Sequence, residues 1–235
     1  MGAKDWMLMY AEGTIAEVLR THPQPDRAAT RALVERLHPE TLLTAVTDGN
    51  LLENPNPPDG LVYAGVYPGL TVLCSGTVAL DRPSTLPAKY LAEANGRTVY
   101  LHATHSVVDW FAYAIWAPDG TLTRSLSLAP DDGVMENIGQ PLPFEHAYWA
   151  GEHPLVAGDP VPVSRAYLPG RSPATPDSPP PMPSEGADSY PLPFHPLELS
   201  EAALRTLFGF VYEGQLLDDD PELEEITLLG YRSAG

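Results

Sequence analysis

The amino-acid sequence predicts an α+β fold, a mainly antiparallel sheet with helices packed on it that is interrupted by a long proline-rich loop. Three segments rich in β-forming residues follow one another between residues 97 and 128, and helical patterns lie before and after them. Strands in a row with helices at the ends are typical of α+β proteins. The 235 residues, 43% of them hydrophobic, suffice for a single domain, 1–235, with a buried core.

The first elements alternate strand and helix signals. We expect a strand over 5–10 and a short helix within 13–22, where apolar residues share one helical face. The clearest helix is 25–39, because apolar residues recur along it at helical spacing and Pro39 stops it.

The next segments predict two hairpins and a short helix. Residues 42–52 are expected to form a hairpin about an Asp-Gly turn, and 60–76 to form two strands about a Pro-Gly turn. A helix is predicted within 82–96, with Ser84 as its N-cap and Gly96 closing it.

Three strands are then predicted at 97–105, 107–116 and 121–128. Both faces of 110–116 are apolar, so we expect this strand to be central in the sheet and covered on both sides. An Ala-Pro-Asp-Gly sequence joins the last two strands and predicts a tight turn.

The composition shifts after residue 153. Thirteen of the 43 residues from 154 to 196 are proline. Such a segment buries too little apolar surface to offset the entropy of ordering it. We therefore predict a mobile, partly polyproline loop over 158–189, inserted before the C-terminal helix and cut first in limited proteolysis.

The C-terminal part predicts a helix over 199–214, with Ser200 as its cap and Gly214 at its end. The acidic run 218–225 contains no basic residue and is expected to be a solvated surface. A last strand is predicted over 226–231.

The net charge of −18, from 31 acidic and 13 basic residues, limits the kinds of partner. It repels the phosphates of nucleic acids and anionic lipid surfaces, and the sequence shows no compensating basic patch. We therefore expect no nucleic-acid and no membrane partner. An acidic surface instead suits a basic protein partner. The oligomeric state leaves no signature in the sequence.

The single cysteine and the N-terminus predict a cytoplasmic location. Cys74 lies in an apolar run, which is typical of a buried small hydrophobic residue. The apolar run at residues 6–10 is too short for a signal peptide or a membrane span.

The bend between the strands 97–105 and 107–116 holds a group of polar residues, which are His102, Thr104, His105, Ser106 and Asp109. Because side chains alternate along a strand, His102 and His105 are expected to face opposite ways. Two interpretations are open for the group. It is either a polar network that holds the bend, which we favour, or a pocket at the end of the sheet.

If the bend forms a pocket, polar residues further along the chain are also candidates for the site. The candidate catalytic residues are His102, His105, Asp109, Glu136 and Glu145. The candidate ligand-binding residues are Thr104, Ser106, Asn137 and His146. The two Glu-His pairs at 145–146 and 152–153 lack any established metal-ligand spacing, so we expect no metal and no cofactor.

Several long strings carry a resemblance to a known family. They are VYAGVYPG, LHATHSVVDWFAYAIW, RSLSLAPDDGVMENIGQPLPFE, YWAGEHP and YPLPFHPLEL. Together they resemble an uncharacterised actinobacterial family, known only as a domain of unknown function, over most of the chain apart from the proline-rich loop. The resemblance implies an actinobacterial source and no activity, cofactor or catalytic residue. The segment 110–128 is also loosely similar to strands of small bacterial immunity and regulatory domains.

These observations favour a non-catalytic cytoplasmic binding or regulatory module, of an immunity-like kind, that engages a protein partner. The proline-rich loop would then be a tether or a recognition segment. The alternative is a hydrolase-like enzyme with a His/Asp/Glu pocket around 102–109 and 136–146. Geometry separates the two, because an enzyme needs at least two of these side chains converging on one open pocket, whereas a binding module has them satisfied by each other or by the backbone.

Overall fold

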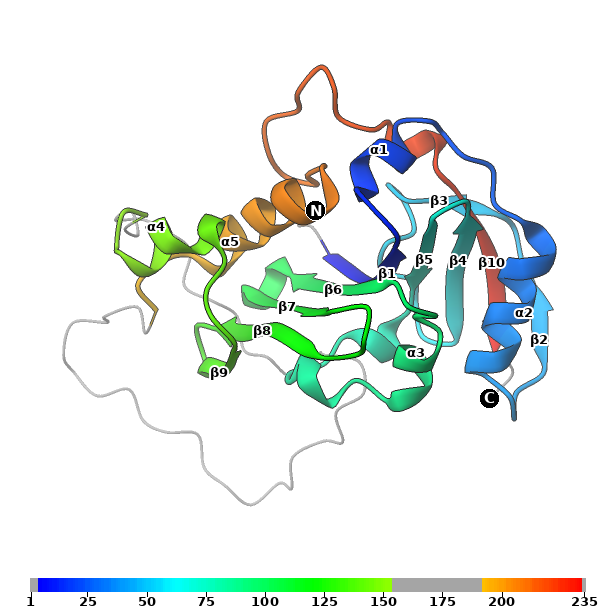
Figure 1. Ribbon diagram of the computed structural model, residues 1–235, viewed down its shortest axis with the longest axis horizontal. Coiled ribbons are helices and arrows are strands. Elements are labelled where there is room, and N and C mark those ends of the chain that lie inside the picture. Colours follow the sequence, from blue (N-terminus) through cyan, green and yellow to red (C-terminus); the bar gives the residue numbers. More distant parts are fainter. Residues whose placement is uncertain (1–3, 154–191, 234–235) are drawn as a thin grey trace.

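The computed structural model describes residues 4–153 and 192–233, and it consists of a large antiparallel sheet with a few short helices (Figure 1). The predicted loop 158–189 lies outside the described residues. The strands are β1 (Lys4–Ala11), β2 (Leu43–Ala45), β3 (Gly49–Asn50), β4 (Leu61–Tyr67), β5 (Leu70–Cys74), β6 (Thr98–His105), β7 (Trp110–Trp116), β8 (Leu122–Ala129), β9 (Gly133–Ile138) and β10 (Thr227–Ser233). The helices are α1 (Ile15–Leu19), α2 (Arg27–Leu37), α3 (Ala88–Ala92), α4 (His146–Trp149) and α5 (Pro196–Ala203).

Short helical turns complete the fold. The 3-10 turns are η1 (Gly76–Val78), η2 (Pro83–Thr85), η3 (Ser106–Val108), η4 (Pro143–Glu145) and η6 (Leu223–Glu225), and η5 (Leu204–Phe208) is a π-helix. The sheet order is β2-β10-β4-β5-β1-β6-β7-β8-β9, with β3 paired to β10 as well. The sheet twists, so that β6 to β8 run across the view while β5, β4 and β10 stand upright (Figure 1).

The first strand, β1, lies inside the sheet and sets its two faces. It pairs with β5 on one side and β6 on the other, so that Met7 lies opposite both Cys74 and His102. Trp6, Leu8 and Tyr10 pack on one face with α2 and α3. Met7 and its neighbours on the other face pack against α1 and η5.

Cys74 is buried as predicted, and this burial raises the pKa of its thiol.

The strand β7 is central and covered on both faces, as the sequence predicts. Trp110 and Ala112 belong to the core that includes α2 and α3, whereas Phe111 and Tyr113 pack under α5. Every residue of this strand except Ile115 is buried. Alternate side chains of β7 therefore pack into the two covering layers, as the sequence pattern predicts.

The strand β9 is not predicted from the sequence. The chain turns at Asp131 and Asp132, with Gly133 after the turn, and then pairs with β8 up to Ile138. β9 forms an edge of the sheet, and most of its residues are half-buried or exposed. Strands are predicted from alternating apolar and polar residues, and an edge strand with this mixed burial lacks that alternation.

The predicted hairpin over 42–52 is wrong. β2 and β3 do not pair with each other, because each of them pairs with β10: Ala45 lies opposite Tyr231, and Gly49 lies opposite Leu228. An Asp-Gly turn signal is local, and here pairing with a strand from the far end of the chain prevails over it.

Two predicted helix caps are also wrong. Ser84 lies in η2, and α3 begins later, after Pro87. The C-terminal helix α5 begins at Pro196, where the ring Nδ1 of His195 accepts a hydrogen bond from the amide of Leu197 at 3.3 Å. Ser200 is therefore a buried residue within the helix.

The C-terminal helical segment ends at Gly209 rather than at Gly214. Gly209 has a φ of 78°, and a Cβ built there would lie 2.3 Å from the Cβ of Ala16 in α1. Only glycine combines this left-handed conformation with so close a contact. The chain therefore leaves the helix five residues earlier than the sequence suggests. In the described residues, no helix is long and apolar enough to cross a membrane.

Candidate functional site

Three structural elements bring an aspartate, a histidine and a serine into one chain of contacts. His102 on β6 places its Nδ1 atom 2.7 Å from the Asp5 Oδ1 atom on β1. Its Nε2 atom lies 3.4 Å from the Oγ atom and 3.2 Å from the carbonyl oxygen of Ser200 on α5. The Ser200 hydroxyl also hydrogen-bonds the Thr104 hydroxyl. Both ring nitrogens of His102 are thereby satisfied.

The order carboxylate, imidazole, hydroxyl is that of a hydrolytic triad, but this cluster is sealed. Asp5 and His102 have no exposed surface, and Ser200 retains 1%. The rings of Phe111 and Phe208 flank His102 with centroid distances of 5.3 and 5.6 Å. A nucleophilic hydroxyl needs space beside it for the reacting carbon, and this burial leaves none. The arrangement fits a polar network that ties α5 to the sheet.

His105 and Ser106 lie away from this cluster. His105 faces the opposite side of the sheet from His102, as expected, and its ring lies 5.8 Å from the ring of Trp6. The Nδ1 atom of His105 and the Oγ atom of Ser106 are buried without a hydrogen-bond partner among the described residues. Burial, and then the charge of Lys4, lower the pKa of His105 to about 4.

We expect acid to destabilise the protein through His105. The unfolded side chain binds a proton near pH 6.5, whereas the folded one does so only near pH 4. Between these values the unfolded state holds more protons, so stability falls as the pH is lowered through this window, by up to about 3 kcal/mol. Urea unfolding of the wild type and of His105→Gln at several pH values measures this term. The variant should lose less stability on acidification, and equal losses would contradict the assignment.

Asp109 joins the bend to the start of α5. It has a left-handed φ of 47°, directly before β7, so the strand begins at Trp110. Its Oδ2 atom lies 3.7 Å from the Nε2 atom of His195, the residue that caps α5. Asp109 therefore faces the entry to α5, and the histidine that it faces is not one of the candidates predicted from the sequence.

Glu136 on β9 holds a neighbouring turn. Its carboxylate accepts hydrogen bonds from the amide of Ser84 at 2.9 Å and from the hydroxyl of Ser84 at 2.5 Å. The hydroxyl of Ser125 on β8 donates to it as well. This carboxylate connects η2 to the sheet edge and has no part in the His102 cluster.

Glu145 forms a buried ion pair with Arg124. The Nε and Nη2 atoms of Arg124 donate to its two oxygens at 2.8 and 2.6 Å. The hydroxyl of Tyr113, the amide of Leu142 and the indole of Trp149 donate to the same carboxylate at 2.5, 2.7 and 3.1 Å. Burial by itself would raise the pKa of Glu145, but the hydrogen bonds from Arg124 and Tyr113 outweigh it and lower the pKa. This carboxylate is therefore ionised, and both of its oxygens accept hydrogen bonds from the protein.

The last two candidates belong to the surroundings of this ion pair. The Oδ1 atom of Asn137 accepts a hydrogen bond from Arg124 at 2.6 Å, and the exposed His146 lies 3.2 Å from the carbonyl oxygen of Pro141. The predicted site residues are thus distributed over several separate networks. In residues 4–153 and 192–233, no group of three His, Cys, Asp or Glu side chains is arranged to hold a metal ion.

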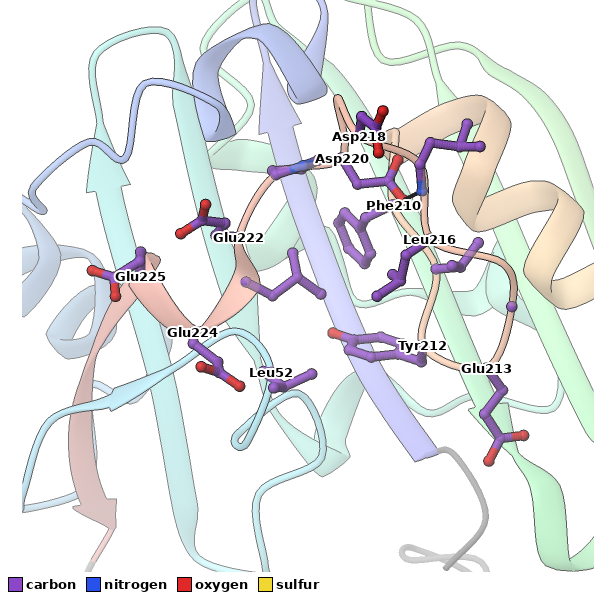
Figure 2. A pocket seen from close by; sticks show the side chains of 15 residues that line it. Leu52, Phe210, Tyr212, Glu213, Leu216, Asp218, Asp220, Glu222, Glu224 and Glu225 are labelled. Atoms are coloured by element: carbon purple, nitrogen blue, oxygen red, sulfur yellow. Dashed lines mark hydrogen bonds between the residues drawn. The ribbon is translucent and has the colours of Figure 1, made fainter.

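An open pocket of about 840 Å³ lies elsewhere, between the segment that follows Gly209 and η6 (Figure 2). Its lining consists of Leu52 and residues 210–214, 216–218 and 220–225. We call this site, formed by Leu52 and residues 210–225, the acidic groove. Its volume is in the range of pockets that bind ligands.

The acidic groove combines an apolar centre with charged edges. Phe210 and Leu223 are buried in its floor. Three leucines are exposed beside them, with exposed fractions of 40% for Leu52, 74% for Leu216 and 50% for Leu217. Five acidic side chains of the lining are exposed, which are Glu213, Asp218, Glu222, Glu224 and Glu225.

Polar contacts at its base hold the groove open. The carboxylate of Glu201 on α5 accepts hydrogen bonds from the amides of Tyr212 and Glu213, each at 3.1 Å. Arg205 pairs with Asp220 and donates to the carbonyl of Gln215 at 2.7 Å. These contacts hold both ends of the segment 212–220, so that its leucines do not fold back into the pocket.

The acidic groove is absent from the sites predicted from the sequence. The run 218–225 is predicted to be a solvated surface without a compensating base, but Arg20 pairs with Asp219 at 3.1 Å and Arg205 pairs with Asp220. The available signal was the pair Leu216 and Leu217 directly before the acidic run, since adjacent leucines are unusual on a purely solvated surface.

The chain is similar to a known protein family. The sequence pattern of a family of unknown function, DUF6928, matches residues 5–169 and 156–231. No curated protein and no solved structure matches the chain.

Proposed function

Since the chain belongs to the family of unknown function DUF6928, we propose a function from its own surface: a non-catalytic binding or regulatory module that engages a protein partner through the acidic groove. One contrast carries this proposal. The Asp5, His102 and Ser200 side chains are buried and hydrogen-bonded in one chain, whereas the open pocket is lined by exposed leucines. Exposed apolar patches with a polar rim are characteristic of interaction sites.

The exposed leucines support the proposal because the fold holds them outward. The carbonyl of Gln215 accepts a hydrogen bond from Arg205 at 2.7 Å, and Asp220 accepts from the amide of Leu217 at 2.9 Å. Hydrogen bonds therefore fix the backbone on both sides of Leu216. A surface that is ordered before binding loses less entropy when a partner arrives.

A cytoplasmic location and an actinobacterial source belong to this proposal. The chain has a single cysteine, which is buried and free, as is usual for proteins of a reducing compartment. The charge of −18 suits a protein that meets partners in solution. A regulatory or immunity-like role would use the acidic groove as its contact surface and the proline-rich segment 158–189 as a tether.

Site-specific photo-crosslinking in the native host tests the proposed function. A photoreactive residue replaces Leu216 in the full chain, and a matched variant carries it at Leu42, which is 77% exposed and lies just before β2. We expect a discrete heavier adduct from position 216 and none from position 42. Adducts of equal yield from both positions, or none from position 216, would contradict a binding role for the acidic groove.

The competing hydrolase function rests on the order Asp5, His102, Ser200 and has its own test. A fluorophosphonate probe labels serines that an adjacent base activates. We expect no labelling of the wild-type protein, because Ser200 is sealed and its Oγ atom lies 3.4 Å from the His102 Nε2 atom. Labelling that disappears in Ser200→Ala would establish an enzyme and overturn the non-catalytic proposal.

A further inference from the structure

We propose that the acidic groove receives a cationic, amphipathic segment of a partner protein, with an apolar side chain in the pocket and Lys or Arg side chains over the rim. This inference rests on the proposed function and names the chemistry of the partner. It follows from three properties of the groove, which are its charge, its apolar centre and the way the two are arranged.

The charge of the groove is of one sign. Residues 213–225 contain seven acidic and no basic residues. The two arginines that reach this segment from outside, Arg20 and Arg205, pair with Asp219 and Asp220, so the rim acids at Asp218 and on η6 lie beyond these pairs. A cluster of exposed carboxylates attracts cationic partners and repels anionic ones.

The apolar centre of the groove requires an occupant that is apolar as well as cationic. A purely cationic ligand would leave Leu216 and Leu217 in water, and they are 74% and 50% exposed. Burying such side chains against a partner contributes roughly 25 cal/mol for each Å² removed from water. Phe210 and Leu223 form a floor on which an inserted side chain can rest. The occupant therefore carries at least one large apolar residue.

The arrangement of the two parts fits an amphipathic segment. Figure 2 shows Glu222, Glu224 and Glu225 on one side of the pocket, Asp218 at its upper end and Glu213 at its lower right. The apolar side chains of Phe210 and Leu216 lie between the acids of the two sides. An apolar strip flanked by acids is complementary to an apolar strip flanked by bases. This pattern matches the recognition of an amphipathic segment in a groove.

Charge also distinguishes this occupant from the other candidates. The proline-rich segment of the chain itself, 154–191, contains four acidic and two basic residues, so its charge does not complement the rim. Nucleic acids and anionic lipid surfaces are repelled by the same carboxylates. A basic segment of a second protein is the occupant that both properties of the groove favour.

Binding of short synthetic peptides to the full chain tests the inference. Four peptides of equal length share one pattern of polar and apolar positions. The polar and apolar residues are Lys and Leu in the first, Lys and Ala in the second, Gln and Leu in the third, and Glu and Leu in the fourth. Fluorescence anisotropy at low and at raised ionic strength gives the Kd of each. We expect the Lys–Leu peptide to bind at least about tenfold more tightly than the other three, and its Kd to rise with salt.

Two groove variants and two matched controls locate the binding site. Leu216→Ser with Leu217→Ser, and Glu222→Gln with Glu224→Gln and Glu225→Gln, should each weaken the Lys–Leu peptide by about tenfold. The amide variant should also flatten the salt dependence. The controls change equally exposed residues on other elements, which are Leu42→Ser, and Glu40→Gln with Asp131→Asn and Glu152→Gln. They should shift the Kd by less than about twofold.

Each contrary result has a definite meaning. Equal weakening by the groove and the control amide variants would show attraction by the net charge alone, and would overturn the inference. Binding of the Glu–Leu peptide, or of a peptide of residues 158–189, as tight as that of the Lys–Leu peptide would overturn it as well. If position 216 still yields its crosslinked adduct while the Lys–Leu peptide fails to bind, the proposed function stands and only the partner chemistry is wrong.

Discussion

Replacing Glu145 by alanine is expected to lower the free energy of unfolding by about 3–5 kcal/mol, because it leaves the charge of Arg124 buried without its partner. Neither side chain is exposed by more than 1%, and the substitution also removes the acceptor for Tyr113, Leu142 and Trp149. A loss of this size is a large part of the 5–15 kcal/mol that usually holds a domain together. Urea unfolding measures it directly.

A double variant separates the buried charge from the volume that is lost. Arg124→Met combined with Glu145→Leu removes both charges and keeps apolar bulk, so it should be more stable than Glu145→Ala alone. Glu152→Ala, at an exposed glutamate shortly after α4, is the matched control and should change stability by less than about 0.5 kcal/mol. A loss below about 1 kcal/mol for Glu145→Ala would show that water reaches the pair.

Trp110→Ala is expected to lower the free energy of unfolding by about 3–5 kcal/mol through the cavity that it leaves. The ring has no exposed surface, lies 6.1 Å from the ring of Trp6, and donates its indole N–H to Ser127 at 3.3 Å. A buried aromatic side chain of this size has many contacts to lose, and the β-sheet around it relaxes only in part.

Two comparisons make the Trp110 result specific. Trp110→Phe keeps most of the ring and should lose clearly less stability than Trp110→Ala. Val107→Ala, three residues earlier at a side chain that is 49% exposed, should be nearly neutral. If Trp110→Ala is also neutral in urea unfolding, β7 is not the covered central strand described above.

The parts of the fold that the sequence predicts are those where a local pattern and the tertiary contacts agree. Residues 110–116 are apolar on both faces, and the structure covers both faces. The helix at 25–39 has an apolar stripe, and α2 buries Leu33, Val34 and Leu37 along it. The opposite orientation of His102 and His105 follows from strand geometry alone.

The parts that the sequence does not predict depend on partners far away along the chain. Asp5 and Ser200 lie 97 and 98 residues from His102, so no spacing rule connects them. Glu145 looks like half of a Glu-His pair, although its partner is Arg124 on β8. The acidic groove forms only because the segment after Gly209 and η6 meet beside Leu52, which belongs to another part of the chain.

The place of β10 in the sheet has a consequence for the folding pathway. This strand fills the space between β2 and β4, and it pairs Leu229 with Ala64, 165 residues earlier. Contacts of such long range form late, because a long loop must close first. Until they form, β4 exposes an unpaired edge that is free to pair with another chain. The rate at which residues 227–233 insert therefore sets how long each newly made molecule is prone to aggregate.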